Sequence, residues 1–429
     1  MRWLVIAIAA CGGGPRYLGA QLPDACAGAD AEACAGWMAE RDLDAGNLDV
    51  YPDAALRRYV QSIADRLARG TGLAHPPRVV ISDHDGTYAA FGDRIVIGRI
   101  AIEKLGSEAE LAAIVAHELV HVEGRHATVS LFGPEADERW LATRRDAEAI
   151  ADERAVTLLE RAGYAPAAMQ HALEAELDPD DDASDDEHPP RALRLAHVEQ
   201  LAGGRIDGFD GRRELLDHVR GMVLGRDTRL GVRVGGGDAW VIARLGVALE
   251  LSPRDVVHVD GDAVVVRHAK SSLTAYAVGA PWARELAATL DERADTETPM
   301  GRVTVGTAPD ATRSEAPLAR LEHSLHDLLP QPAPGAWVVI LDRPCGGLVL
   351  ELSPRTDPAI RDRWLQGLRA ATAGELAAAE PRHLRVVRAP RAGTVAELVQ
   401  ACPDPDAAAK LDRADRVLGA GDPIKCTDR

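Results

Sequence analysis

Aromatic side chains are scarce in this sequence, because Phe, Trp and Tyr together make up only 4% of its 429 residues. The hydrophobic content is nevertheless 46%, which is enough for a substantial core built mostly from Ala, Leu and Val. A chain of this length has room for two or three domains. The lack of aromatics therefore does not exclude a globular fold; it predicts a core of small and aliphatic side chains.

Lysine is also scarce, and negative charge exceeds positive charge, with 67 Asp and Glu against 49 Lys and Arg. Lysine is limited to Lys104, Lys270, Lys410 and Lys425, and the formal net charge is -18 with a pI near 5.2. A protein that binds nucleic acid needs a basic face to neutralise phosphates. The composition therefore predicts no nucleic-acid partner.

The sequence has no apolar run of the roughly 18 residues that a membrane helix requires. The run from Trp3 to Ala10 fits the short core of a signal peptide, and Ile8-Ala9-Ala10-Cys11 resembles a bacterial lipobox, in which the cysteine is diacylated. We expect a lipid on Cys11 that anchors the protein to a membrane of the bacterial envelope, facing the periplasm. The alternative is that this run is the buried start of the first domain.

No C-x2-C pair occurs, which argues against zinc-binding cysteines. An exported chain can instead oxidise its remaining thiols. Proximity favours pairing Cys26 with Cys34 and Cys345 with Cys402, which would leave Cys426 free. The sequence alone leaves this connectivity open.

The stretch from Ala116 to His126 reads AHELVHVEGRH and concentrates three histidines and two glutamates in eleven residues. A capping-box pattern at Ser107 and Glu110 precedes it, the apolar residues have helical spacing, and Gly124 within it is a natural stop. The motif is therefore predicted to lie within a helix. Upstream, the spacing predicts a helix from Asp53 to Gly70 and a strand from Pro77.

Residues four apart on a helix share a face, so His117 and His121 can bind one tetrahedral ion. Glu118 lies beside the first of them and can reach a metal-activated water without binding the metal itself. This is an H-E-x-x-H arrangement, which chance also produces. It requires a third ligand.

The third ligand is expected on another helix, because one helix cannot surround an ion. The stretch from Asp137 to Ala162 has helical spacing and ends at Gly163. Within it, Glu148 and Asp152 are again four residues apart and share a face. Glu148 could complete a His2Glu set while Asp152 hydrogen-bonds a ligand imidazole. The alternative is a pair of solvated carboxylates on a surface helix.

Together, HELVHVEGRH, EAIAD, LLERAGYAP and HPPRALR resemble the HtpX/BepA-like zinc metallopeptidases, a gluzincin family that includes the CAAX prenyl proteases. The resemblance covers roughly Tyr51 to Leu201. It implies one Zn²⁺ per chain on His117, His121 and Glu148, which activates a water for attack on a peptide bond.

Three further residues have expected roles in catalysis. Glu118 would take the proton of the attacking water and return it to the leaving amine. Arg194 is our candidate for stabilising the oxyanion. By resemblance, His188 approaches the metal and either assists catalysis or holds the site closed. The alternative for His188 and Arg194 is an ordinary helix start capped by proline.

Substrate is expected to bind by main-chain pairing, which gives affinity with little sequence preference. The predicted strand before the histidine helix would offer the edge, unless it is an inner strand. Its residues are Arg94, Ile95, Val96, Ile97 and Gly98.

The carboxy-terminal half predicts alternating strands and helices, including helices over Arg212–Arg226, WARELAATLDERA and RDRWLQGLRAATAGELAAA, around one antiparallel sheet. The last segment faintly resembles the peptidoglycan-binding LysM pattern. The fold class is therefore α+β: a mainly helical zincin-type metallopeptidase domain with a small sheet, then an α+β accessory domain. The expected boundaries are a signal peptide at 1–10, a linker at 11–50, the peptidase domain at 51–202, a helical connector at 203–235, the accessory domain at 236–376 and a C-terminal module at 377–429.

The sequence thus predicts a lipid-anchored zinc metalloendopeptidase that acts on unfolded or misassembled envelope proteins. The alternative is a binding or scaffold lipoprotein with a latent peptidase site, in which the C-terminal module does the work and peptidoglycan is a weaker candidate partner. The complete metal set favours the enzyme.

Overall fold

The computed structural model describes residues 50–83, 87–90, 93–126, 138–176, 189–225, 228–260, 263–308, 332–333, 335–343 and 346–428. Cys11, Cys26, Cys34, His188 and Cys345 lie outside the described residues. The predictions of a lipid on Cys11, of a role for His188 at the metal and of a Cys26–Cys34 pairing therefore remain predictions.

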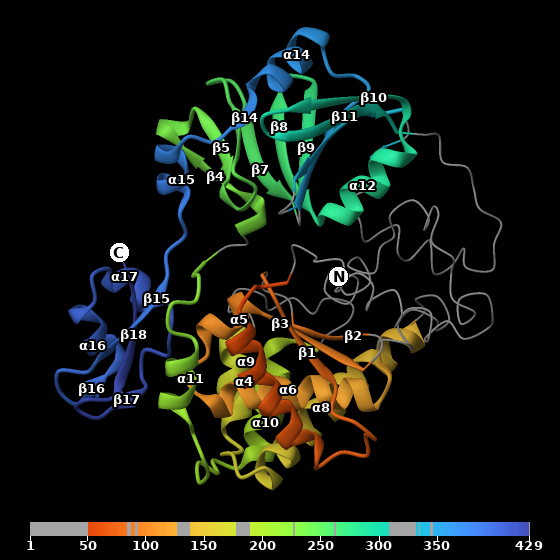
Figure 1. The fold of residues 1–429 in the computed structure, drawn as a ribbon. Helices are drawn as coiled ribbons and strands as arrows, with labels where there is room; N and C mark the ends of the chain where they lie inside the picture. Colours follow the sequence, from red (N-terminus) through yellow and green to blue (C-terminus); the bar gives the residue numbers. More distant parts are fainter. Residues whose placement is uncertain are drawn as a thin grey trace. The chain divides into compact units, whose positions relative to one another are not determined.

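The described chain is α+β, as predicted, and forms two compact units (Figure 1). Unit 1 contains Tyr51–Gly225 and, after a long excursion of the chain, Arg382–Arg429; unit 2 contains Arg226–Pro381. The carboxy-terminal segment thus belongs to the same unit as the H-E-x-x-H helix. The finer domain boundaries expected from the sequence remain predictions.

The first helix of unit 1 follows the sequence pattern closely. Helix α4 (Ala54–Ala68) begins where the Asp53 carboxylate accepts the backbone N–H groups of Ala55 and Leu56, and it ends just before Gly70. Its predicted apolar stripe is buried. These buried residues are Leu56, Tyr59, Val60, Ile63 and Leu67.

A three-stranded sheet lies against α4, in the order β1 (Arg78–Ser82), β3 (Arg94–Gly98), β2 (Tyr88–Ala90). The central strand β3 pairs in parallel with β1 and antiparallel with β2, and all five of its residues are buried. The prediction that Arg94–Gly98 offers a free edge to substrate was therefore wrong, because both of its edges already carry ladder hydrogen bonds. The edge nearest the histidine helix is the short strand β2.

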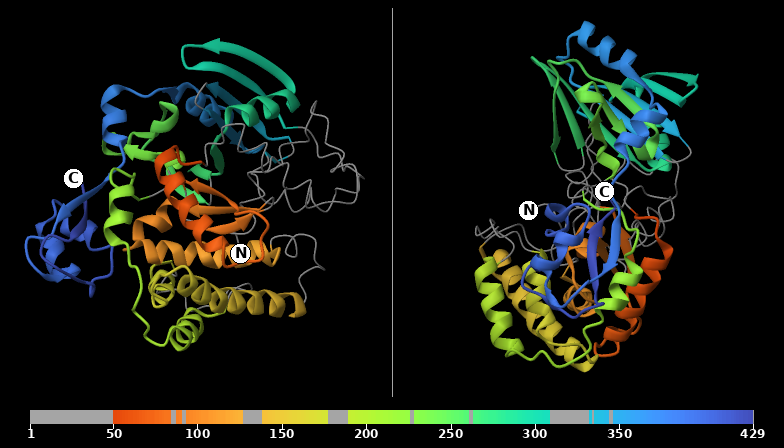
Figure 2. Two further views of the ribbon diagram at one scale, coloured as in Figure 1. Left: turned by 60° about the horizontal axis from the view of Figure 1, so that its bottom comes forward. Right: turned by 90° about the vertical axis from the view of Figure 1, so that its left-hand side faces the viewer.

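The histidine helix α6 (Glu108–Glu123) begins and ends as predicted, with the Ser107 hydroxyl accepting the N–H of Glu110 and Gly124 at the C-cap. The second hydrogen bond of the predicted capping box differs, since the Glu110 carboxylate accepts the N–H of Gly106 and not that of Ser107. Apolar residues on nearly every side of the helix are buried. The helix packs against α4, the sheet and later helices of the same unit, whose ribbons Figure 2 shows from two further directions. A helix buried in this way is a rigid platform for side chains.

Helix α8 (Glu138–Arg161) packs along α6 and ends two residues before Gly163, whose φ of +84° suits glycine. The next residue, Tyr164, donates its hydroxyl to the Glu108 carboxylate at the first turn of α6. The A-G-Y segment therefore ties the end of α8 to the start of the histidine helix.

Four shorter helices are also described between Tyr51 and Gly225: α5 (Arg99–Lys104), α9 (Ala168–Glu176), α10 (Arg191–Ala202) and α11 (Arg212–His218). The predicted helix from Arg212 to Arg226 was too long. It stops at Val219, and Gly221 and Gly225 take positive φ values of +83° and +79° that end the helical path.

In the carboxy-terminal segment, β15 (Leu384–Arg388) pairs antiparallel with β18 (Pro423–Thr427). Along the chain between these two strands are a small antiparallel pair, β16 (Gly393–Thr394) with β17 (Val417–Leu418), and the short helices α16 (Val395–Leu398), η4 (Val399–Ala401) and α17 (Pro405–Ala408). Cys402 forms a disulfide with Cys426, 24 residues later. The proposed Cys345–Cys402 pairing and the free Cys426 were therefore wrong, because β18 brings Cys426 back beside the end of η4.

Buried charges attach this segment to the start of α6. The Arg212 guanidinium donates to the carbonyls of Gly106 (2.7 Å) and Pro423 (3.1 Å), and its Nη1 lies 2.6 Å from the Asp412 carboxylate. Lys425, only 1% exposed, donates to three backbone carbonyls, and Arg416 forms an ion pair with Glu110. Each buried charge thus meets an opposite charge or a carbonyl, as burial requires.

Unit 2 contains two antiparallel sheets rather than the single sheet expected. The larger sheet has the order β10-β11-β12-β13-β9-β8-β7 and the smaller β14-β6-β5-β4. The strands of the larger sheet are β7 (Val256–Asp260), β8 (Ala263–His268), β9 (Ser271–Val278), β10 (Asp291–Thr298), β11 (Gly301–Thr307), β12 (Trp337–Arg343) and β13 (Gly346–Leu352). Those of the smaller are β4 (Val232–Val234), β5 (Ala239–Ile242), β6 (Val247–Glu250) and β14 (Leu368–Ala370).

Two helices predicted for unit 2 are interrupted by strands. The first corresponds to α12 (Ala280–Thr289), which is shorter than predicted, and the last residues of the predicted helix belong to β10. The second is divided into α14 (Pro358–Gly367) and α15 (Ala373–Ala379) by β14, which pairs with β6. At β14, pairing with the distant β6 overrode the local helical pattern. At β10, the partner is the next strand, β11, with which it forms a hairpin. The remaining 3-10 turns are η1 (Thr228–Leu230), η2 (Gly235–Gly237) and η3 (Ala243–Leu245).

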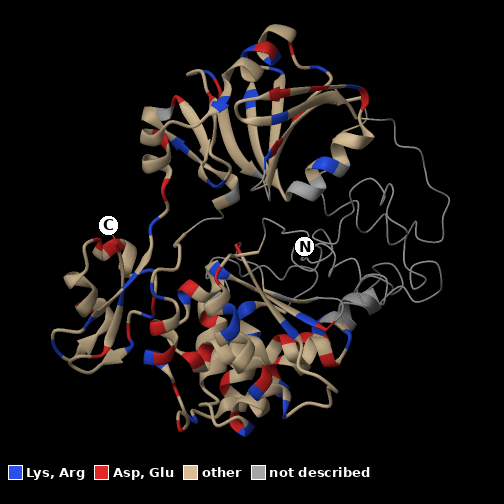
Figure 3. Ribbon diagram, in the orientation of Figure 1, with Lys and Arg blue, Asp and Glu red and all other residues tan. Residues whose placement is uncertain are grey.

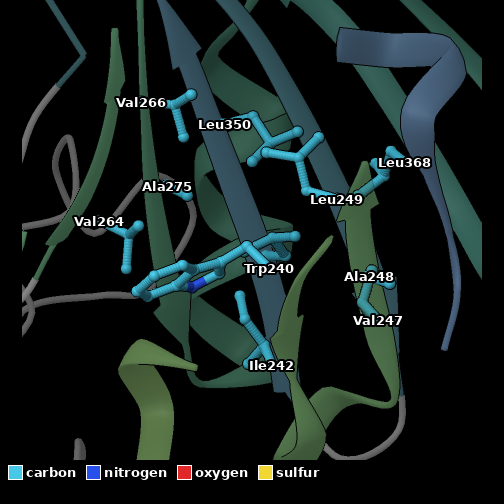
Figure 4. A pocket seen from close by; sticks show the side chains of 11 residues that line it. Trp240, Ile242, Val247, Ala248, Leu249, Val264, Val266, Ala275, Leu350 and Leu368 are labelled. Atoms are coloured by element: carbon cyan, nitrogen blue, oxygen red, sulfur yellow. The ribbon is translucent and has the colours of Figure 1, made fainter. Parts of the chain in front are cut away.

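Apolar side chains from both sheets of unit 2 surround a small gap (Figure 4). Trp240, Leu249 and Leu350 are among those that line it, and its volume is about 10 Å³. A gap of this size holds at most one water molecule. It is therefore an imperfection of core packing rather than a ligand site.

Among the described residues, no helix is long and apolar enough to cross a membrane. Acidic and basic residues alternate along the helices of unit 1 (Figure 3).

We expect Arg212→Met to lower the free energy of unfolding of unit 1 by about 3–5 kcal/mol, because it leaves the buried Asp412 carboxylate without its nearest cation. Burial would raise the pKa of Asp412, but Arg212, Lys425 and Arg416 outweigh it and hold the pKa below its usual value. This stabilisation is therefore present at neutral pH and is lost as the pH falls through the folded-state pKa.

The measurement is urea denaturation followed by hydrogen exchange of peptides from α6, which separates unit 1 from unit 2. The neighbouring exposed Arg213 supplies the matched control, Arg213→Met, which should change stability by less than about 0.5 kcal/mol. Equal effects of the two substitutions would contradict the structural role of Arg212.

Candidate metal centre

Three side chains from two helices converge on one point. His117 and His121 lie on the same face of α6, and Glu148 reaches them from α8. The two Nε2 atoms are 3.0 Å apart, and the Glu148 oxygens lie 3.3 Å from each of them. The three side chains are each about 12% exposed, so the point is shielded but accessible.

These separations fit a bound metal ion. A tetrahedral Zn²⁺ with ligand bonds of about 2.0–2.1 Å separates neighbouring ligand atoms by about 3.3 Å. Two imidazole nitrogens and one carboxylate are also a ligand set that Zn²⁺ favours in catalytic sites, where a fourth position is left for water. The predicted ligand residues are thus brought together in a geometry that suits zinc.

A second carboxylate lies behind the first ligand. The Asp152 oxygen is 3.0 Å from Nδ1 of His117, the nitrogen that faces away from the point of convergence. An acceptor at this position fixes the ring so that Nε2 faces the metal.

The Arg194 side chain, from α10, contacts two carboxylates of the site. Its Nε and Nη2 donate to the two Asp152 oxygens at 3.0 and 2.7 Å, and Nη2 is 3.4 Å from Glu148. The side chain is 7% exposed. These contacts place Arg194 behind the metal ligands, where its charge offsets those of Asp152 and Glu148. The oxyanion role expected for Arg194 remains a prediction.

The charges of the site shift its pKa values. Burial would lower the pKa of His117, but hydrogen bonding with Asp152 and Glu148 outweighs burial and raises the pKa to about 10. Burial would raise the pKa of Glu148, but His121 and His117 hold it well below its usual range. The glutamate is thus kept as the anion that a metal ligand must be.

Glu118 occupies the position of a general base. It is 7% exposed, and burial raises the pKa of its carboxyl although the two nearby imidazoles partly oppose the rise. The carboxylate also forms a hydrogen bond with the backbone of Ala89 in the edge strand β2. The edge strand therefore lies beside the catalytic candidate, a placement that the sequence did not predict.

The third histidine of the motif, His126, also lies at the site. Its Nδ1 is 2.8 Å from Nδ1 of His121, and burial together with the charge of His121 lowers the pKa of His126 to about 4. The sequence analysis counted His126 among the three histidines of the motif but assigned it no role.

The geometry agrees with a comparison to known families. Residues 54–138 match peptidase family M48. The chain is also 29% identical over 100 residues to the Beta-barrel assembly-enhancing protease of Yersinia pestis. The aligned part is 23% of this chain and 20% of that protein, so the likeness spans about a fifth of the relative's length.

The resemblance to HtpX/BepA-like metallopeptidases is thereby confirmed. The family match includes His117, Glu118 and His121 but ends before Glu148. The assignment of Glu148 as third ligand therefore rests on its distance from the two imidazoles.

We expect the purified protein to bind one Zn²⁺ and to melt at a higher temperature when zinc is added, because a metal that binds only the folded state stabilises it. Asp152→Asn should weaken zinc binding by about 10- to 100-fold through the loss of the charged acceptor for His117. Competition with a chromogenic chelator measures both.

The matched control is Glu153→Gln, an exposed carboxylate at the next position of α8. It should bind zinc as the wild type does. If Asp152→Asn also bound zinc at wild-type strength, Asp152 would have no part in orienting the ligand.

Proposed function

We propose that this chain is a zinc-dependent metalloendopeptidase. The observation that carries the proposal is the convergence of His117, His121 and Glu148 at mutual distances of 3.0–3.3 Å, with Glu118 on the same helix. Zinc held there would supply a Lewis acid that polarises the peptide carbonyl and makes water nucleophilic near neutral pH. The family match supports the reaction class.

Glu118 would accept the proton of the attacking water and transfer it to the leaving amine. A carboxyl whose pKa is raised by burial is suited to this work, since it takes up a proton more readily than an exposed glutamate. Arg194 and Asp152 would act indirectly, by holding His117 in place and balancing the negative charge behind it.

Substrate would bind in an extended conformation along β2. This strand lies at the edge of its sheet and contacts Glu118 through Ala89, so a peptide paired with it would pass the metal centre. Main-chain pairing accepts many sequences but needs an unfolded segment. Unfolded proteins are therefore the substrate class that this arrangement supports.

We further propose that the substrates are unfolded or misassembled proteins of a bacterial envelope and that a lipid on Cys11 anchors the enzyme there. The name of the Yersinia pestis relative, which refers to β-barrel assembly, supports an envelope role. The lipobox-like start of the sequence supports the anchor.

Glu118→Gln is expected to reduce cleavage of an unfolded model protein such as reduced casein by about 10²- to 10⁴-fold, because it removes the proton acceptor. Zinc content should stay at one per chain, since Glu118 is not a ligand. Product formation on gels and zinc content by atomic absorption are the two measurements.

The control is Glu199→Gln, an exposed glutamate on α10. It should leave both readouts unchanged. Full zinc occupancy with no cleavage by the wild type would overturn the peptidase and leave a metal-binding protein.

A further inference from the structure

The predicted ligand set leaves one histidine of the motif without a role. His126 follows the end of α6, and the chain reverses direction immediately before it, where Arg125 takes a positive φ of +53°. Such a conformation is uncommon for a residue with a side chain. Its effect here is to fold His126 back towards the helix that it has just left.

The return of His126 depends on a glycine. A Cβ atom placed on Gly124 would lie 2.3 Å from Nε2 of His126 and 2.8 Å from its Cδ2. These distances are far below contact, so the imidazole lies directly over the bare α-carbon. Gly124 has an ordinary φ of -77°, which means that space for the ring, rather than backbone conformation, is what this position requires.

The ring of His126 then meets that of His121 edge to face, with centroids 4.8 Å apart and an interplanar angle of 78°. The two Nδ1 atoms are 2.8 Å apart, a hydrogen-bond distance. His121 directs its other nitrogen, Nε2, at His117 and Glu148. One nitrogen of His121 thus faces the metal position, and the other faces His126.

A histidine that binds a metal through Nε2 carries its proton on Nδ1, and that N–H needs an acceptor. We propose that His126 is this acceptor and acts as a positioning residue that fixes the tautomer and the ring orientation of His121. The inference rests on the proposed zinc site. His126 is not a further ligand in this arrangement, since its Nδ1 faces His121 rather than the point where the three ligands meet.

The two ligand imidazoles therefore have different supports. His117 is backed by the Asp152 carboxylate, which Arg194 in turn neutralises. His121 is backed by an imidazole, which accepts a hydrogen bond without adding negative charge. The site already contains the carboxylates of Glu118, Glu148 and Asp152, so an uncharged acceptor supports the second ligand without increasing their mutual repulsion.

The test uses the full chain with one of three substitutions. His126→Ala removes the acceptor, and Gly124→Ala displaces the ring while keeping it in the sequence. His126→Asn restores an acceptor, because the Oδ1 atom of asparagine occupies nearly the same place as Nδ1 of histidine. His75→Ala, at an exposed histidine, is the control.

Zinc affinity is measured by chelator competition, and the ligand geometry is measured from the visible absorption of the cobalt(II)-substituted protein. We expect His126→Ala and Gly124→Ala to weaken zinc binding by about 10- to 100-fold and to alter the cobalt spectrum. His126→Asn and His75→Ala should remain close to the wild type in both measurements.

Wild-type zinc affinity in His126→Ala, or equal weakening in His126→Ala and His126→Asn, would overturn the positioning role. Neither result depends on proteolysis, so a wild type that binds zinc but cleaves nothing would contradict the proposed function while leaving this inference intact. Failure of the wild type to bind zinc would overturn the metal centre and this inference together.

Discussion

The packing of α6 against α8 is the constraint on which the site depends. Two imidazoles on one helix reach an ion from one side only, and a tetrahedral ion needs a ligand from another direction. Helix α8 supplies it by holding the Glu148 oxygens 3.3 Å from both Nε2 atoms. Because α6 is buried on nearly all sides, its position is fixed by close packing, and the ligand distances are fixed with it.

Each of the many charged groups buried near the site needs a partner of opposite charge or a hydrogen bond. Asp152 lies between the His117 imidazole and the Arg194 guanidinium, and neither the anion nor the cation is left alone in the interior. The same principle operates at the other end of α6, where Glu110 meets Arg416 from a segment 306 residues further along the chain. The carboxy-terminal segment is therefore a structural part of the unit that holds the metal site.

Local patterns predicted the elements that carry the site. The capping residues Ser107 and Gly124 and the four-residue spacing of His117 and His121 act within one or two helical turns, so they can be recognised in the sequence. The same reasoning was wrong where pairing is non-local. It took the inner strand β3 for an edge, extended a helix into β14, which pairs with the distant β6, and paired Cys402 with the wrong cysteine.

The sequence by itself determined which residues can bind a metal: two histidines on one helical face, a glutamate between them, and two carboxylates four apart on the next long helix. Only the tertiary structure decided that Glu148 reaches both histidines, that β2 is the edge beside Glu118, and that His126 folds back onto His121. Spacing fixes the direction of a side chain within its own helix. The partner it meets depends on packing between segments that are distant in the sequence, and no local pattern contains that information.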